Sequence, residues 1–303
     1  SKNTGTRNRW TKPEICNGMA LISMATYCTP DNGRAPLLKQ TLDSLLETVD
    51  FSRHRIFVIV NQATEESTEY LLAFQKALPF PDSLDSIIWL PENIGTARAI
   101  NKAWALRRPG EHAIKMDDDV VVHRSGWVEE MEESIERANR IGIIGLKRKD
   151  LLESPNRPAG DPYRSILAEV PHAAGQKNLY IEIVEHVMGT CQMYNAALLD
   201  RIGYLYQPGL YGYDDSLAAT RCKKAGFMSC FLCGVEIDHI DPGGNEYTQV
   251  KRDAAGIDQA EYHRIRDAIE SGRMGVYFDV DGNNVIEHHT PGYQFATVNY
   301  STR

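Results

Sequence analysis

The stretch Lys115-Met116-Asp117-Asp118-Asp119-Val120-Val121-Val122 decides how the rest of the chain is interpreted. Its three carboxylates follow apolar Ala113-Ile114 and precede three valines. Runs of valine and isoleucine are typical of buried strands, and acids do not lie inside a strand unless they are paired or bound to a cation. The triplet is therefore expected to end one strand, precede another and point into a crevice. A divalent cation with phosphate co-ligands would relieve the repulsion between the carboxylates, and a solvated acidic turn is the alternative.

Strand and helix patterns alternate on the N-terminal side of the triplet. In chain order they predict a strand at 19–27, a helix after residue 37, a strand at 56–60, a helix at 65–78, a strand at 87–90 and a helix at 95–106. This alternation predicts an α/β fold with a mostly parallel central sheet and helices on both faces. Ligands bind at the carboxyl ends of the strands in such sheets. Thr26, Asn61 and Asp117 are expected to gather at that edge.

The second half of the chain continues with less regular patterns. They predict a helix at 127–138, strands at 141–146 and 180–187, helices at 196–202 and 211–225, and a strand at 227–237. Residues 150–178 are rich in proline, glycine and charge and are predicted to form a loop or a substrate-side insertion. The last sixty residues are expected to add a helix at 259–271 and a hairpin across Asp281-Gly282.

Composition limits the classes of protein that fit. The net charge is −8 and no block is rich in lysine and arginine, which disfavours a nucleic-acid partner without excluding it. No apolar run approaches the roughly 20 residues of a membrane span. The segment Ser1–Lys12 lacks the apolar stretch of a secretory signal, and the six cysteines are scattered rather than arranged as a disulfide framework. We therefore expect a cytoplasmic protein.

Four stretches resemble GT-A glycosyltransferases, in particular the large family 2 group. They are Asn93–Asn101, similar to an Asn-x-Gly helix opening; Lys115–Val120, similar to an Asp-x-Asp motif; Gly212–Phe227, similar to a Gly-Tyr-Glu-Asp segment; and Val235–His239, similar to a later strand that ends in histidine. The resemblance implies a Rossmann-like GT-A domain at 17–242, with a nucleotide and metal half at 17–122 and an acceptor half at 123–242. An N-terminal arm (1–16) and a C-terminal extension (243–303) would flank it.

This resemblance implies a hexosyl- or pentosyltransferase. A nucleotide sugar, with a UDP-sugar favoured, would donate its sugar to a hydroxyl group of a glycan or another acceptor. Inversion at the sugar is expected, from the resemblance and from a plausible base at Asp215. Mn²⁺ or Mg²⁺ would neutralise the diphosphate leaving group. Asp119 would bind the metal. Asp117 would bind the ribose or share the metal, and Asp118 could do either.

Further residues carry expected roles. His239 is the best candidate for an additional metal ligand, because a neutral imidazole suits Mn²⁺; a strand-end histidine bonded to backbone is the alternative. His186 has a weaker claim as a ligand. Asp215 is expected to be the general base with Asp214 in support, near a helix start that favours the anion. Capping of that helix is the alternative role for the pair.

The nucleotide is expected to contact one end of the sheet. Thr26 and Asn61 would meet the base or ribose, and Asn93 and Gly95 open the helix beside them. Arg98, one turn past Gly95, could reach a phosphate or the sugar, although a solvated arginine is nearly as plausible. Relatives more often have Asp in place of Asn61 and Glu in place of Asp214, which loosens these two assignments.

Three rival functions remain open at this stage. A nucleotidyltransferase would normally carry a glycine-rich loop after its first strand, and here that loop has only Gly33. A non-catalytic sugar-nucleotide or glycan-binding module could use the same scaffold. A glycosyltransferase acting on modified DNA bases would need a basic groove, for which the candidates are Arg148, Lys149, Arg157 and Arg164.

Overall fold

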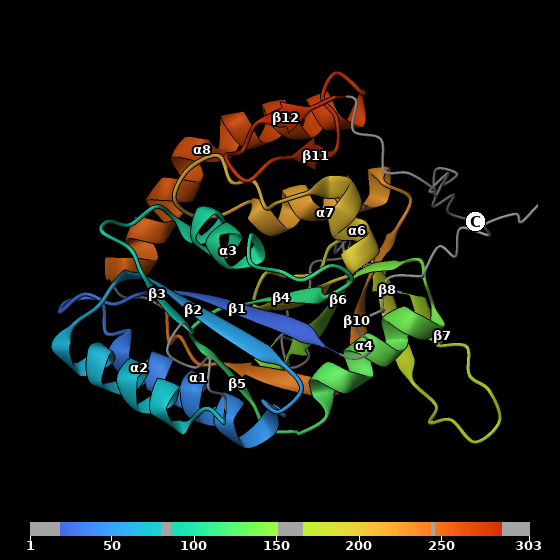
Figure 1. Cartoon of the computed structure of the whole chain (residues 1–303). Coiled ribbons are helices and arrows are strands. Elements are labelled where there is room, and N and C mark those ends of the chain that lie inside the picture. The colour runs from blue at the N-terminus through green and yellow to red at the C-terminus, as the bar shows by residue number, and fades with distance from the viewer. Residues whose placement is uncertain (1–18, 80–85, 151–165, 244–245, 287–303) are drawn as a thin grey trace, which may run out of the picture.

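A central mixed sheet runs through the described part of the chain, between two layers of helices (Figure 1). The computed structural model describes residues 19–79, 86–150, 166–243 and 246–286 of the 303. The predicted arm at 1–16 lies outside these residues. No helix among them is both long enough and apolar enough to cross a membrane.

Ten strands form this sheet, in the order β3-β2-β1-β4-β9-β6-β10-β8-β7, with β5 paired to β10. Their bounds are β1 Ala20–Tyr27, β2 Arg55–Gln62, β3 Ile87–Trp89, β4 His112–Met116, β5 Val120–Val122, β6 Ile141–Arg148, β7 Ile166–Glu169, β8 Tyr180–Val184, β9 Cys191–Tyr194 and β10 Met228–His239. The pairing directions make β3, β2, β1, β4, β6, β10 and β7 run one way, and β9, β8 and β5 the other. The α/β class with a mostly parallel central sheet is confirmed.

Helices cover both faces of the sheet. Their bounds are α1 Ala35–Thr48, α2 Glu65–Ala77, α3 Thr96–Trp104, α4 Trp127–Arg137, α6 Ala196–Ile202, α7 Asp214–Lys224 and α8 Glu246–Glu270. In Figure 1, α1, α2 and α4 lie below the sheet, whereas α3, α6 and α7 lie above it. The long helix α8 forms an outer element over α7, together with the small hairpin of β11 (Tyr277–Phe278) and β12 (Asn284–Val285).

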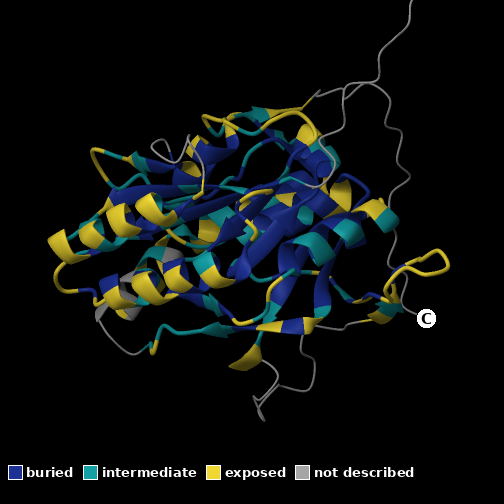
Figure 2. Cartoon of the chain, turned by 60° about the horizontal axis from the view of Figure 1, so that its bottom comes forward, coloured by how far each residue is buried: buried dark blue, intermediate teal, exposed yellow. Residues whose placement is uncertain are grey.

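The core fills the space on both sides of the strands. Figure 2 shows the central strands as mostly buried and the outer faces of the helices as exposed. On the α1 face, Leu38, Leu42 and Leu45 are buried against the sheet, as their helical spacing predicts. Burial of both faces explains why the strands read as apolar runs rather than as an alternating pattern.

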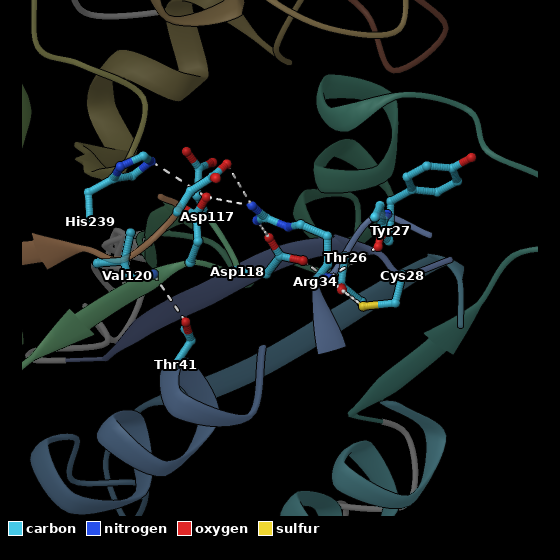
Figure 3. A network of polar contacts seen from close by, with 12 residues as sticks. Thr26, Tyr27, Cys28, Arg34, Thr41, Asp117, Asp118, Val120 and His239 are labelled. Carbon is cyan, nitrogen blue, oxygen red and sulfur yellow. Dashed lines mark hydrogen bonds and ion pairs between the residues drawn. The ribbon is translucent and has the colours of Figure 1, made fainter. Parts of the chain in front are cut away.

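The acidic triplet lies where the sequence predicts it. Strand β4 ends at Met116, β5 begins at Val120, and the three aspartates form the tight connection between them. Helix α1 supports this connection, because the Val120 amide donates a hydrogen bond of 3.1 Å to Thr41 Oγ1 (Figure 3). The carboxylates are thus fixed to the sheet on one side and face a cavity on the other.

The structure differs from the predicted secondary structure in three places. Strand β9, between β4 and β6, was not predicted, because the buried polar side chain of Gln192 interrupts its apolar pattern. The predicted loop at 150–178 contains β7, an exposed edge strand that pairs with β8. Helix α8 begins at Glu246 instead of 259. The side chains described between 249 and 257 are all half-buried or exposed, with Ile257 81% exposed, so they give no apolar stripe from which a helix would be predicted.

The C-terminal hairpin is fastened to α7 by one buried side chain. The Arg221 guanidinium donates hydrogen bonds to the carbonyl oxygens of Val276 (2.9 Å), Tyr204 (2.7 Å) and Ile202. Its carbon Cζ lies 4.8 Å from the centre of the Phe278 ring. These contacts attach the C-terminal elements to the helix whose first two residues are Asp214 and Asp215.

Candidate active site

A cavity of about 430 Å³ opens at the carboxyl ends of β1, β2 and β4. It brings together residues that are far apart in the sequence. The candidate residues among its lining are Thr26, Asn61, Asn93, Asp117, Asp118, Asp119, Asp214, Asp215 and His239. Further lining residues include Arg34, Lys115, Arg148, Gly189, Tyr211 and Lys251. The two acidic groups predicted from the sequence therefore share one cavity.

Asp118 is held by protein groups on both of its oxygens. Thr26 Oγ1 donates to Asp118 Oδ2 at 2.7 Å, and Arg34 Nη2 donates to Asp118 Oδ1 (Figure 3). These bonds tie the end of β1 and the start of α1 to the acidic turn. Thr26, predicted to contact the nucleotide, thus also positions a carboxylate of the triplet.

Asp119 is buried, with 2% of its surface exposed, and its two oxygens differ. Oδ2 accepts a hydrogen bond of 2.8 Å from Arg34 Nη1 and lies 3.5 Å from His239 Nε2. Oδ1 is buried and has no hydrogen-bond partner. A buried carboxylate oxygen without a donor is costly unless a cation binds it, so this atom has the chemistry of a metal ligand.

His239 supplies a nitrogen beside that carboxylate. Burial lowers the pKa of His239, against the pull of Asp119, which keeps the ring in the neutral form that metals bind. Among the described residues no three acidic, histidine or cysteine side chains already form a metal-binding group. Asp119 and His239 thus fit a cation whose remaining ligands come from elsewhere, such as phosphate oxygens.

Asp117 is the most accessible of the three acids, with 34% of its side chain exposed, within the cavity. Burial by the cavity walls, reinforced by Asp119 and Asp214 and opposed by Lys115, raises its pKa to about 7. Lys115 Nζ lies 3.3 Å from a carboxylate oxygen of Asp117 and 3.3 Å from one of Asp214. It also donates to the Gly189 carbonyl oxygen at 2.8 Å. One buried ammonium group therefore connects the triplet to the second acidic pair.

The second acidic pair begins α7, just after a strained residue. Tyr213 has φ = 68° and is the one non-glycine residue with positive φ in the described chain. Such a backbone costs roughly 1–3 kcal/mol and persists only where the surroundings impose it. Its ring stacks on Tyr262 of α8, with centroids 4.4 Å apart and planes at 12°. Helix α8 thereby helps to fix the direction in which Asp214 and Asp215 project.

Asp215 is surrounded by donors. The Ser216 and Gly189 amides donate to it at 2.7 and 3.0 Å, and His186 Nε2 lies 3.2 Å from Oδ2. Burial alone would raise the pKa of Asp215, but these groups and Lys115 outweigh it and lower the pKa to about 2. Asp214 behaves oppositely, because burial and the charge of Asp215 raise its pKa despite Lys115. Two adjacent carboxyls thus have separate acidities, which is common where they divide chemical roles.

The predicted nucleotide contacts are placed unequally. Asn61 Oδ1 accepts from the Ile94 amide at 3.0 Å and Asn93 Oδ1 from the Gly95 amide at 2.9 Å, so these amides shape the cavity wall. Gly95 has φ = 85°, and a Cβ there would lie 2.9 Å from the Leu210 backbone. Arg98 is exposed and does not line the cavity, because its position on α3 faces away from the sheet. The predicted phosphate contact of Arg98 therefore lacks support from its position.

Several site residues escaped the sequence interpretation. Arg34 lies in the loop before α1. The sequence analysis used this loop only to disfavour a nucleotidyltransferase, because it contains a single glycine. His186 was considered only as a weak metal candidate, and the structure pairs it with Asp215. Asp241 Oδ2 accepts a hydrogen bond of 3.1 Å from Arg34 Nη1, and its position two residues after His239 was the available signal. Of the proposed basic groove, Arg148 lines the cavity and pairs with Asp150, whereas Arg157 and Arg164 lie outside the described residues.

The family model described as "Glycosyl transferase family 2" matches residues 28–203, more than half of the chain. The match includes the acidic triplet and ends before Asp214, Asp215 and His239. No curated protein matches the chain.

Solved glycosyltransferases share the fold. The mannosyltransferase PcManGT from Pyrobaculum calidifontis, in complex with GDP-Man and Mn²⁺, is 16% identical with a TM-score of 0.51 over 78% of this chain and 60% of its own. S. aureus TarS 1-349 in complex with UDP is 14% identical, with a TM-score of 0.52 over 72% and 59%. GalNAc-T7 with UDP, GalNAc and Mn²⁺ is 12% identical, with a TM-score of 0.53 over 84% and 51%. The chain thus spans about half to three fifths of the length of these proteins.

Proposed function

The chain belongs to glycosyl transferase family 2, and on that premise we propose that it is a metal-dependent enzyme that moves a sugar from a nucleotide sugar to an acceptor hydroxyl group. One observation carries this proposal. The acidic triplet and the Asp214-Asp215 pair line the same 430 Å³ cavity and are joined by Lys115. A leaving diphosphate and an acceptor could therefore be bound within reach of each other.

Asp119 and His239 would hold the divalent cation, which supplies positive charge to the diphosphate as it leaves. The unpartnered Oδ1 of Asp119 supports this assignment. Asp117, the accessible acid of the turn, would meet the ribose or the outer shell of the cation. Solved structures of the same fold contain Mn²⁺ with GDP-Man, or with UDP and GalNAc.

Asp215 would act as the general base. The acceptor oxygen attacks the anomeric carbon, its proton passes to the Asp215 carboxylate, and the bond from that carbon to the diphosphate breaks. A single displacement of this kind inverts the anomeric centre. With a pKa of about 2, Asp215 is ionised at neutral pH, so it accepts the proton late, when the hydroxyl has become acidic. Asp214 would support it by holding Lys115.

The nucleotide would lie along the ends of β1 and β2, beside Thr26, Asn61 and Asn93, with a UDP-sugar as the favoured donor. The acceptor would enter near His186 and Tyr211, and a glycan is the favoured acceptor class. Helix α8 contributes Lys251 and Ala254 to the cavity lining.

Donor hydrolysis tests the proposal. We expect release of sugar from one member of a panel of UDP-, GDP- and dTDP-sugars with Mn²⁺, and loss of that release with EDTA. If every donor is inert and no free nucleotide with Mn²⁺ raises the melting temperature, the metal-nucleotide proposal is overturned and the non-catalytic binding module becomes the favoured alternative.

The His186–Asp215 pair makes stability depend on pH. Burial opposes the charged form of His186, but Asp215 and Asp214 outweigh it and raise the pKa of His186 above 6.5. The pair therefore stabilises the fold fully below pH 6.5, and this contribution is lost as pH rises through the raised pKa. We expect His186→Gln to lower the melting temperature at pH 6, and the difference from wild type to shrink by pH 9.

A matched control is His123→Gln, because His123 pairs with Asp238 on the surface, where its side chain is 66% exposed. Exposed pairs contribute about 0–1 kcal/mol, so this variant should melt within a few degrees of wild type throughout. A difference between His186→Gln and wild type that stays constant from pH 6 to 9 would contradict the assignment of charge to this pair.

A further inference from the structure

We infer that Arg34 is a built-in cation that occupies the metal position of the metal-free protein, and that a divalent cation must displace it from Asp119. This inference rests on the proposed function, because it concerns how the proposed metal site becomes available. Asp241 joins Asp119 and His239 as a candidate ligand of the displacing cation.

The position of one nitrogen atom carries the inference. Arg34 Nη1 lies 2.8 Å from Asp119 Oδ2 and 3.1 Å from Asp241 Oδ2. It thus bridges carboxylates from the turn after β4 and from the segment after β10, as a metal ion would. The side chains are nearly inaccessible, with 4% of Arg34, 3% of Asp119 and 7% of Asp241 exposed. A guanidinium group in such a setting neutralises acids that would otherwise repel one another.

Arg34 donates to Asp119 Oδ2, an oxygen that a bound cation would also contact. His239 Nε2 approaches Asp119 from the Oδ2 side, at 3.5 Å. A cation bound by His239 and by both oxygens of Asp119, the unpartnered Oδ1 included, would therefore contact Oδ2, to which Arg34 now donates. A divalent cation and a guanidinium group cannot both lie within bonding distance of that oxygen, because their charges repel strongly in a buried site. Metal and Arg34 are accordingly alternative partners of Asp119.

Arg34 also contacts Asp118, and this contact can persist when the contact with Asp119 is lost. Its Nη2 donates to Asp118 Oδ1, and Thr26 holds the other oxygen of Asp118. When Nη1 leaves Asp119, the Arg34 side chain can keep its contact with Asp118 (Figure 3). Arg34 and Asp118 both line the cavity. A diphosphate in the cavity offers the released guanidinium a new anionic partner. Metal and nucleoside diphosphate are then expected to strengthen each other's binding.

The test is the affinity for Mn²⁺ alone, measured by calorimetry on wild type and Arg34→Met. We expect Arg34→Met to bind Mn²⁺ about tenfold more tightly or better, because the competitor is gone. We also expect UDP or GDP to enhance Mn²⁺ binding less in this variant than in wild type. Unchanged or weaker Mn²⁺ binding by folded Arg34→Met overturns the inference.

Two further variants make the result specific. Arg124→Met also removes one positive charge, but Arg124 pairs with Glu130 and does not line the cavity. It should change the Mn²⁺ affinity by less than about threefold, and a gain equal to that of Arg34→Met would reduce the effect to net charge alone and overturn the inference. If Arg34→Met does not fold, Arg34→Gln decides. Glutamine can still donate a hydrogen bond but carries no positive charge, so tighter Mn²⁺ binding supports the competition and unchanged binding refutes it.

Failure of this inference is distinguishable from failure of the proposed function. Mn²⁺ binding is measured without any sugar donor. Tighter Mn²⁺ binding by Arg34→Met, in a protein that shows no transfer activity, would support competition between Arg34 and the metal and refute the proposed transferase function. Mn²⁺-dependent transfer with an unchanged Mn²⁺ affinity in Arg34→Met keeps the enzyme and removes the competition.

Discussion

Asp119→Asn lowers metal-dependent sugar transfer by about a thousandfold or more, corresponding to about 4 kcal/mol of lost transition-state stabilisation. Asp119 carries the one carboxylate oxygen of the triplet that is buried without a hydrogen-bond partner, and His239 lies beside it. An amide is a much weaker ligand than a carboxylate, so the charge on the leaving diphosphate would be poorly neutralised. The measurement is kcat/KM for the active donor at saturating Mn²⁺.

Asparagine is preferable to alanine here, because it keeps an oxygen for Arg34 and leaves less of the buried guanidinium unpaired. A matched control is Asp43→Asn on α1, where the acid is 53% exposed and pairs only with Lys39 among the contacts described here. That variant should keep wild-type activity within about twofold. Asp119→Asn with more than a tenth of wild-type activity contradicts the metal assignment.

Asp215→Asn lowers kcat by about a hundredfold to ten-thousandfold, the range expected for loss of a general base. Asparagine keeps one acceptor oxygen, which can still accept the hydrogen bond that the Ser216 amide donates to Asp215 Oδ1, so the first turn of α7 should remain in place. It cannot take a proton from the acceptor. Because the donor's diphosphate would lie at the triplet, nucleotide affinity should stay within about threefold of wild type.

Asp214→Asn is the informative comparison for Asp215. Asp214 lies 3.3 Å from Lys115, whereas among the described ion pairs His186 is paired with Asp215. We expect a loss in kcat at least about tenfold smaller than for Asp215→Asn. If the two variants lose activity equally, or if Asp214→Asn is the more damaged, the base is Asp214 or the pair acts as a unit.

Much of the fold was accessible from local patterns. The first four strands and the helices between them follow apolar runs and leucine spacing, because both faces of the sheet are buried there. Strand β9 has four buried residues, but it is short and includes Gln192, whose amide donates to the Val187 carbonyl oxygen instead of facing water. The partners that allow such a strand are set by the tertiary structure, so its sequence carries no clear signal.

The acidic residues of the candidate site could be predicted from the sequence, whereas its basic residues could not. Carboxylates grouped after a strand stand out in a sequence, and Asp117, Asp118, Asp119, Asp214 and Asp215 do line one cavity. Arg34 and Lys115 resemble ordinary surface residues by type, yet both are buried between acids that approach from distant segments. Such pairings depend on which strands are neighbours. Local sequence patterns do not carry the order of strands in the sheet.

The most direct test of the central claim is calorimetric binding of UDP and GDP to wild type and Asp119→Asn, each with Mn²⁺ and with EDTA. The account predicts that one of the two nucleotides binds wild type with Mn²⁺, and that EDTA or Asp119→Asn weakens this binding at least about tenfold. Equal affinity in Mn²⁺ and EDTA, or no binding of either nucleotide by wild type, would contradict a metal-dependent nucleotide site at the acidic turn.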